Sequence, residues 1–251
     1  MVLQRSRDSF HDLSMPRRPP GIQLMTPGDF SGQAPLAALW LAYFIVHSAL
    51  ASHALKTWMA RVRPHWMAGY RLAFNLVAVL ALLPVLRQLH HNPGPMLWAW
   101  NGPWSWLANG LALAAAIGFM ATLRHYDGGE FLGWRQWRER ARTADDREAL
   151  RISPLHRHVR HPWYAFGLVV VWTRDMSAAM LVSAVLITAY LVVGARLEER
   201  TLLARHGDAY RRYMRRVPGL LPRPGRSLTA GEADALTRLA VRGEEDAPPP
   251  R

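Results

Sequence analysis

Long apolar blocks separated by basic stretches dominate the pattern along this chain of 251 residues. Three blocks, at 35–54, 70–89 and 104–123, are each close to the ~20 residues that an α-helix needs to cross a bilayer. Two less regular blocks follow. One begins at Pro162 and ends at Arg174-Asp175, and the next covers 176–195. The predicted fold class is therefore all-α: an integral membrane bundle of about five transmembrane helices that ends in a helical hairpin.

The two ends of the chain differ from this membrane domain, which we place at 34–225. Residues 1–33 are polar and contain Pro and Arg, without the continuous apolar region of a secretory signal. They are expected to form a flexible arm, and Met15 and Met25 allow the natural start to lie downstream. Residues 226–251 end in an acidic, Pro-rich stretch, which predicts a disordered tail.

The formal net charge of +13 is concentrated in particular loops. The loop after the first span, the segment 124–160 and the tail after Arg196 are basic, whereas 90–103 has no Lys or Arg. Cytoplasmic loops carry such an excess, so the C-terminus is expected in the cytoplasm of a bacterial inner membrane. Four Trp residues between 98 and 106 fit an aromatic belt at the outer interface. The same placement argues against nucleic-acid binding, since no base-contact motif accompanies the charge.

The chain has no Cys, which excludes disulfides, thiolate nucleophiles and Cys-type zinc sites. Its chemistry must use other groups, and these gather just before the fourth span, where 156–161 reads His-Arg-His-Val-Arg-His. Only about 11 apolar residues follow Pro162, roughly 16 Å of helix, so a full crossing must draw this segment into the membrane region. Ionisable groups at that depth usually mark a functional cavity. Alternatively, this is a basic loop whose side chains reach the headgroups.

The fifth span ends in Glu198-Glu199, at the same membrane face as the basic segment. One reading is an ordinary network of exposed ion pairs, worth about 0–1 kcal/mol each. The other is a polar pocket, built from both ends of the hairpin, that holds a zwitterionic ligand.

An ordered series of motifs favours the pocket. Arg160-His161-Pro162-Trp163-Tyr164 is followed by Glu198-Glu199, then by Gly207, Tyr210 and Tyr213, and then by Val217-Pro218 and Leu221-Pro222. This order resembles the signature of the isoprenylcysteine carboxyl methyltransferase superfamily, over about 154–222. Upstream, His47-Ser48 and the segment 127–136 resemble its bacterial methanethiol S-methyltransferase branch. The chain departs from the superfamily pattern at Pro154, His156 and Phe166, which leaves the acceptor open.

The resemblance implies methyl transfer from S-adenosylmethionine, held between the last two spans and the C-terminal segment. Arg160 and His161 suit the carboxylate of this cofactor, and Glu198 or Glu199 its ammonium group. Tyr164, Tyr210 and Tyr213 are expected to pack on the adenosyl group or to donate hydrogen bonds. The expected cofactor-binding set is Arg160, His161, Pro162, Tyr164, Glu198, Glu199, Tyr210 and Tyr213.

The acceptor is expected to be a small or lipophilic molecule at the membrane, and a thiol in the first place. A thiol needs deprotonation, for which His156 or His161 can serve as base beside Arg160. The alternative acceptor is the carboxyl group of an isoprenylated or lipid-like acid, which needs no base.

Two readings from other classes stay open. The spacing His156-x-His158-x-x-His161 allows a membrane haem or metal protein, although on one helix His156 would turn away from the other two, and we expect no metal. The departures from the motif also allow a non-enzymatic membrane protein with a decayed site. The oligomeric state cannot be read from the sequence.

Overall fold

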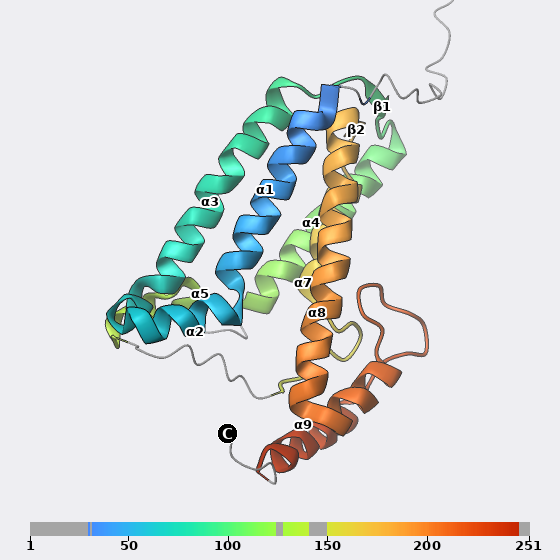
Figure 1. The fold of residues 1–251 in the computed structure, drawn as a ribbon. Helices are drawn as coiled ribbons and strands as arrows, with labels where there is room; N and C mark the ends of the chain where they lie inside the picture. The colour runs from blue at the N-terminus through green and yellow to red at the C-terminus, as the bar shows by residue number, and fades with distance from the viewer. Residues whose placement is uncertain (1–29, 31, 124–127, 141–149, 246–251) are drawn as a thin grey trace, which may run out of the picture.

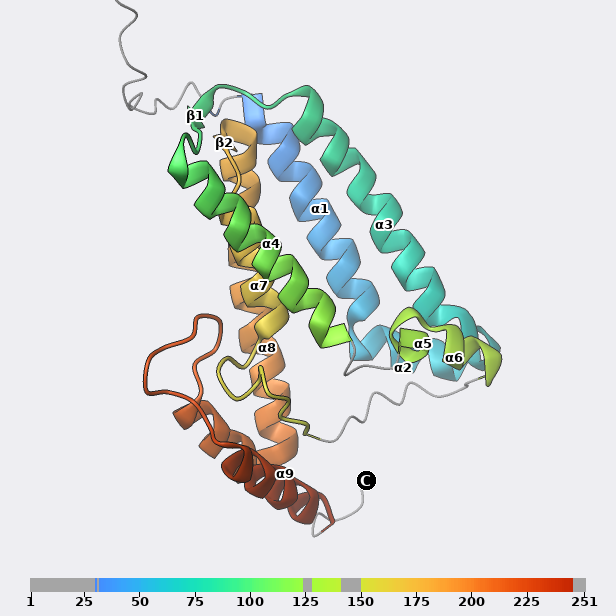
Figure 2. The same cartoon turned by 180° about the vertical axis from the view of Figure 1, so that it is seen from behind.

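The computed structural model describes residues 30, 32–123, 128–140 and 150–245. Its longest elements are α1 (Ala34–Ala51), α3 (Met67–His91), α4 (Pro103–Leu123) and α8 (Ala178–Arg216), which form an elongated bundle together with the shorter α7 (Pro162–Trp172) (Figures 1 and 2). Within the described ranges four helical stretches are long and apolar enough to cross a membrane, whereas α7 has 11 residues. The all-α membrane fold is confirmed, with four such stretches and one short helix in place of five spans.

The outside of the bundle is apolar, as expected where lipid is the solvent. Ile45, Val79 and Ile117 are each about 60% or more exposed, and such a surface along a whole bundle is foreign to soluble proteins. Exposed Trp side chains lie toward both ends: Trp104 and Trp106 at the start of α4, and four others, Trp58, Trp66, Trp134 and Trp137, near the opposite end. Trp favours the two membrane interfaces.

A short two-stranded sheet closes the end of the bundle where α8 begins (Figure 1). β1 (Met96–Trp98) pairs antiparallel with β2 (Met176–Ser177), a pairing that the sequence pattern does not predict. Asp175 accepts a hydrogen bond from the backbone N–H of Trp100 at 2.9 Å. The polar pair Arg174-Asp175 therefore marks the turn between α7 and α8, as expected for the hairpin.

Short helices lie at the opposite end: α2 (His53–Val62), the 3₁₀ helix η2 (Pro64–Trp66), α5 (Gly128–Leu132) and α6 (Trp134–Arg138). Gly133 joins α5 to α6 with a φ of +90°, and a Cβ there would come within 2.7 Å of Arg71 Cβ. Glycine is needed both for this backbone conformation and for the close approach to α3. The Asn75 side chain also donates to the Leu132 carbonyl at 3.1 Å.

The C-terminal region corrects one prediction. Residues 226–251 were expected to be disordered, but Ala230–Glu245 form helix α9, which packs against the end of α8. Thr229 and Glu232 cap its first turn reciprocally, with Thr229 N–H donating to Glu232 Oε2 at 2.8 Å and Glu232 N–H donating to Thr229 Oγ1 at 3.3 Å. The acidic and Pro-rich composition of the last residues obscured the amphipathic pattern just before them. Residues 246–251, and nearly all of the predicted arm at 1–33, lie outside the described residues.

Candidate active site

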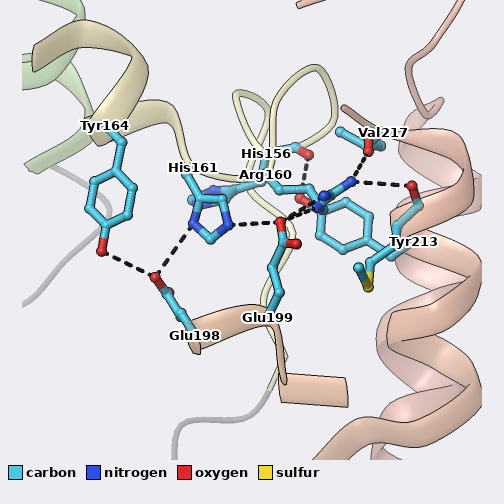
Figure 3. Close-up of polar contacts among 9 residues, drawn as sticks. His156, Arg160, His161, Tyr164, Glu198, Glu199, Tyr213 and Val217 are labelled. Atoms are coloured by element: carbon cyan, nitrogen blue, oxygen red, sulfur yellow. Dashed lines mark hydrogen bonds and ion pairs between the residues drawn. The ribbon is translucent and has the colours of Figure 1, made fainter. Parts of the chain in front are cut away.

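The basic segment before α7 is held by backbone pairing with the chain that follows α8. The N–H groups of Arg160 and His161 donate to the carbonyls of Pro218 and Gly219 at 2.9 and 3.0 Å. The motif around Val217-Pro218 therefore has a structural role, because it fixes the backbone from which the Arg160 and His161 side chains project (Figure 3).

Arg160 lies in a buried ion pair with Glu199. Its Nε and Nη2 donate to Glu199 Oε1 at 2.9 and 2.6 Å, and the two side chains are only 11% and 13% exposed. Nη1 donates to the carbonyls of Met214 and Val217. A buried pair is stable only when such further hydrogen bonds satisfy its polar atoms. Most of the Arg160 guanidinium is thus used to join α8 to the segment before α7.

His161 stands between the two carboxylates of α8, as Figure 3 shows. Its Nε2 lies 3.0 Å from Glu199 Oε1 and its Nδ1 lies 3.4 Å from Glu198 Oε2. Burial alone would lower the pKa of His161, but hydrogen bonds and charge from Glu198, and then from Glu199, outweigh it and raise that pKa above its ordinary value. The imidazolium form therefore fits this position.

Tyr164 and Glu198 form the open side of the cluster. The Tyr164 ring stacks on His161 with centroids 5.3 Å apart, and its hydroxyl donates to Glu198 Oε2 at 3.2 Å. The Glu198 side chain is 48% exposed, unlike that of Glu199. The cluster thus presents one accessible carboxylate beside a buried cationic pair.

His156 has different surroundings. Its Nδ1 lies 2.7 Å from Ser153 Oγ, and burial, followed by the charge of His161, lowers its pKa. His158 is exposed, so the three histidines of the segment do not converge. Among the described residues, no three His, Asp or Glu side chains are placed to hold a metal ion.

Tyr210 and Tyr213 lie beneath the cluster. Both are almost fully buried, and they belong to a core that includes Val217, Leu228 and Ala233. The Tyr213 hydroxyl donates to the His156 carbonyl at 2.6 Å. This placement follows from Gly207, whose φ of +51° kinks α8 and redirects its last turns.

The structure thus brings together Arg160, His161, Tyr164, Glu198 and Glu199, with the buried Pro162 at the first position of α7. It places Tyr210, Tyr213 and His156 in the supporting layer.

Sequence reasoning missed Gly219, where a Cβ would lie 3.4 Å from Arg160 Nη2. The glycine after Val217-Pro218 was the available signal. The departure at Phe166 has a packing reason, since its ring lies on Gly118 of α4, where a Cβ would approach within 2.7 Å.

Curated relatives with assigned activities resemble most of this chain. A methanethiol S-methyltransferase of a Pseudomonas strain is 33% identical over 207 residues, which is 75% of each chain. Methanethiol S-methyltransferase 2 of Bradyrhizobium diazoefficiens is 35% identical over 82% of this chain and 79% of its own. A methanethiol S-methyltransferase of Mycobacterium tuberculosis is 34% identical over 78% and 81%. No family model matches the chain, and no solved structure does.

Proposed function

Because the chain belongs to the methanethiol S-methyltransferase family, we propose that it methylates a small thiol with S-adenosylmethionine at the cluster around His161. Family membership confirms the predicted resemblance and the assignment as a methyltransferase. The observation that supports this site most directly is the joining of Arg160-His161 to Glu198-Glu199 across α7 and α8.

The residues present fit the cofactor's zwitterionic end. An ammonium group needs an accessible carboxylate, and Glu198 is half exposed beside the buried pair. A carboxylate needs positive charge nearby, and His161 in its favoured imidazolium form supplies this by its charge, since both of its ring nitrogens already face Glu198 and Glu199. Arg160 is already largely used by Glu199 and two carbonyls, so we assign it mainly to positioning Glu199 and His161. Tyr210 and Tyr213 belong to the buried core next to these residues. A direct contact of either ring with the adenosyl group stays a prediction.

S-adenosylmethionine supplies a methyl group activated on a sulfonium. The protein's part is then to bind, to orient and to exclude water, because an in-line displacement needs alignment more than proton transfer to the donor. The buried Arg160–Glu199 pair gives the cluster a fixed geometry, and the stacked Tyr164 holds the ring of His161 in place. Such rigid positioning is what brings the reacting atoms of two substrates into line.

We also place this end of the bundle in the bacterial cytoplasm. The basic segment before α7 and the Arg-rich end of α8 lie here, which follows the excess of positive charge in cytoplasmic loops. A cofactor made in the cytoplasm would reach the site from this side, while an apolar acceptor is available from the membrane.

Calorimetric binding of S-adenosylmethionine to the detergent-solubilised full chain tests the site. Glu198→Gln should weaken affinity about tenfold or more, because a charge-assisted hydrogen bond is lost and 1.4 kcal/mol corresponds to a factor of ten. Asp208→Asn is the matched control, since Asp208 lies on the same helix in exposed ion pairs with Arg211 and Arg212. Equal affinity in both variants, or no binding to the wild-type chain at high micromolar cofactor, would contradict the proposal.

A further inference from the structure

A second polar cluster lies between α1 and α8, apart from the site around His161. His47 of α1 has its Nδ1 3.0 Å from the hydroxyl of Tyr190 on α8, and Ser48 Oγ lies 3.0 Å from the same hydroxyl. Three polar side chains thus meet between two apolar helices. Polar groups at such a depth are expensive in a membrane and usually serve a function.

Aromatic rings fix the orientation of this cluster. The Tyr190 ring stacks on Phe44 with centroids 4.2 Å apart, and the His47 ring contacts Phe74 of α3 at 5.2 Å and Tyr43 at 5.7 Å. The titratable groups facing His47 are therefore Tyr43 on its own helix and Tyr190 on α8, while α3 presents the uncharged Phe74.

The cluster shares helix α8 with the site around His161. Tyr190 precedes Glu198 by two turns of α8, roughly 12 Å along the helix. Tyr164 of α7 donates from its hydroxyl to Glu198 Oε2 at 3.2 Å. Side chains of α8 thus take part in both clusters, Glu198 beside His161 and Tyr190 beside His47.

A cavity of about 530 Å³ lies near His47, which is not among the described residues that line it. Its described lining comes from the end of α1, from α2, η2, α3 and α6, and contains no Arg, Lys, Asp or Glu. Phe74 forms part of this wall and also contacts the His47 ring. A cavity with such a lining suits a small, uncharged, apolar molecule. An alkyl thiol that still carries its S–H proton is such a molecule.

We propose that His47 is the catalytic base that takes the proton of the acceptor thiol, with Tyr190 as its positioning residue. This inference rests on the proposed function. The thiol S–H bond breaks and its proton goes to His47 Nε2. The sulfur then forms a bond to the methyl carbon, and the electron pair of the broken carbon–sulfur bond stays on the donor, which leaves as a neutral thioether.

The hydrogen bonds around His47 fit this role. When Nδ1–H donates to the Tyr190 hydroxyl, Nε2 is the acceptor nitrogen, and within the described part of the chain it has no hydrogen-bond partner. His161, by contrast, has both ring nitrogens facing carboxylates. Of the two, only His47 has a ring nitrogen without a hydrogen-bond partner among the described residues.

The test compares two acceptors with His47→Gln in the full chain. An alkyl thiol titrates near or above the ~8.5 of cysteine and needs a base at neutral pH, whereas an acidic aryl thiol is already ionised. The alkyl thiol should lose about 10²–10⁴-fold in rate, and the aryl thiol less than tenfold, with unchanged affinity for S-adenosylmethionine. The alkyl rate of the variant should also rise with pH as thiolate accumulates.

His53→Gln is the matched control, because His53 is an exposed histidine whose ring bonds only to Thr57 in the described structure. Tyr190→Phe keeps the stacked ring and removes the hydroxyl, so it tests the same role if the first variant does not fold. It should slow the alkyl reaction at neutral pH, by a factor that shrinks as pH rises and thiolate accumulates, and leave the aryl reaction within a few-fold.

An equal loss with both thiols, or no loss with the alkyl thiol, would overturn the assignment of His47. If the wild-type chain methylates no thiol at all, the proposed function itself fails, and this result is seen before any variant is made.

Discussion

At the scale of single residues, Arg160 and Glu198 belong to one cluster but differ in what they do for the fold. Arg160 is 11% exposed and is the main partner of the buried Glu199, whereas Glu198 is half exposed. Arg160→Ala removes the main partner of the buried Glu199 and leaves it only His161, which should cost about 3–5 kcal/mol. Glu198→Ala should lower the free energy of unfolding by less than about 1 kcal/mol. Thermal unfolding of the two variants in detergent measures the difference.

The double variant Arg160→Met with Glu199→Leu should regain much of this stability, since it removes both charges of the buried pair. Equal destabilisation by Arg160→Ala and Glu198→Ala would show that the pair is not the structural centre of the site.

His161 and His156 should give stability profiles of opposite sign against pH. The folded-state pKa of His161 is raised, so its contribution is complete below the unfolded value of about 6.5 and is lost as pH rises through the folded value. The pKa of His156 is lowered by burial, so it destabilises the fold as pH falls below about 6.5.

Melting temperatures of the wild-type chain, His161→Gln and His156→Gln across pH 5–9 separate the two effects. The advantage of the wild-type chain over His161→Gln should shrink with rising pH, and His156→Gln should gain on the wild-type chain in acid. Parallel profiles for all three proteins would contradict the surroundings described for both rings.

At the scale of elements, α9 stabilises the layer beneath the site. Ala233 is 3% exposed and packs in the core of Tyr210 and Tyr213, whereas Ala235 on the same helix is exposed. Ala233→Asp buries an unpaired carboxylate, which should cost several kcal/mol, and Ala235→Asp should stay within about 0.5 kcal/mol. Thermal unfolding of both variants measures the difference, and equal melting temperatures would mean that α9 does not pack as described.

The sequence predicted the long helices well because their apolar blocks approach the length of a bilayer crossing. It predicted that Arg160-His161 and Glu198-Glu199 lie at the same end of the hairpin, but it assigned these charges to a ligand and not to the direct pair between Arg160 and Glu199. It did not predict α9, the β1–β2 pairing or the role of Gly219. The β1–β2 pairing depends on contacts between segments far apart in the chain, such as Ala178 N–H donating to the Pro95 carbonyl, and no local pattern encodes it. Local signals for the other two features were present but missed: the amphipathic stretch after Thr229 for α9, and the glycine after Pro218.

At the scale of the whole molecule, the apolar exterior and the polar cluster have different roles in methyl transfer. The exterior faces lipid, and the cluster faces the polar methyl donor. Helices α1, α3, α4 and α8 expose apolar side chains where lipid surrounds them, and exposed Trp residues lie toward both ends. The ionic cluster and α9 lie toward the end opposite the β1–β2 sheet (Figure 2). A polar donor and an apolar acceptor can thus approach one site from two different phases.

Product formation measures thiol methylation by this chain most directly. Purified wild-type protein in detergent, supplied with S-adenosylmethionine and methanethiol, should release dimethyl sulfide into the headspace in proportion to enzyme, and Glu198→Gln should release at least about tenfold less at limiting cofactor. Absence of dimethyl sulfide from protein that binds the cofactor, or methylation of an isoprenylated carboxylic acid in its place, would contradict the account.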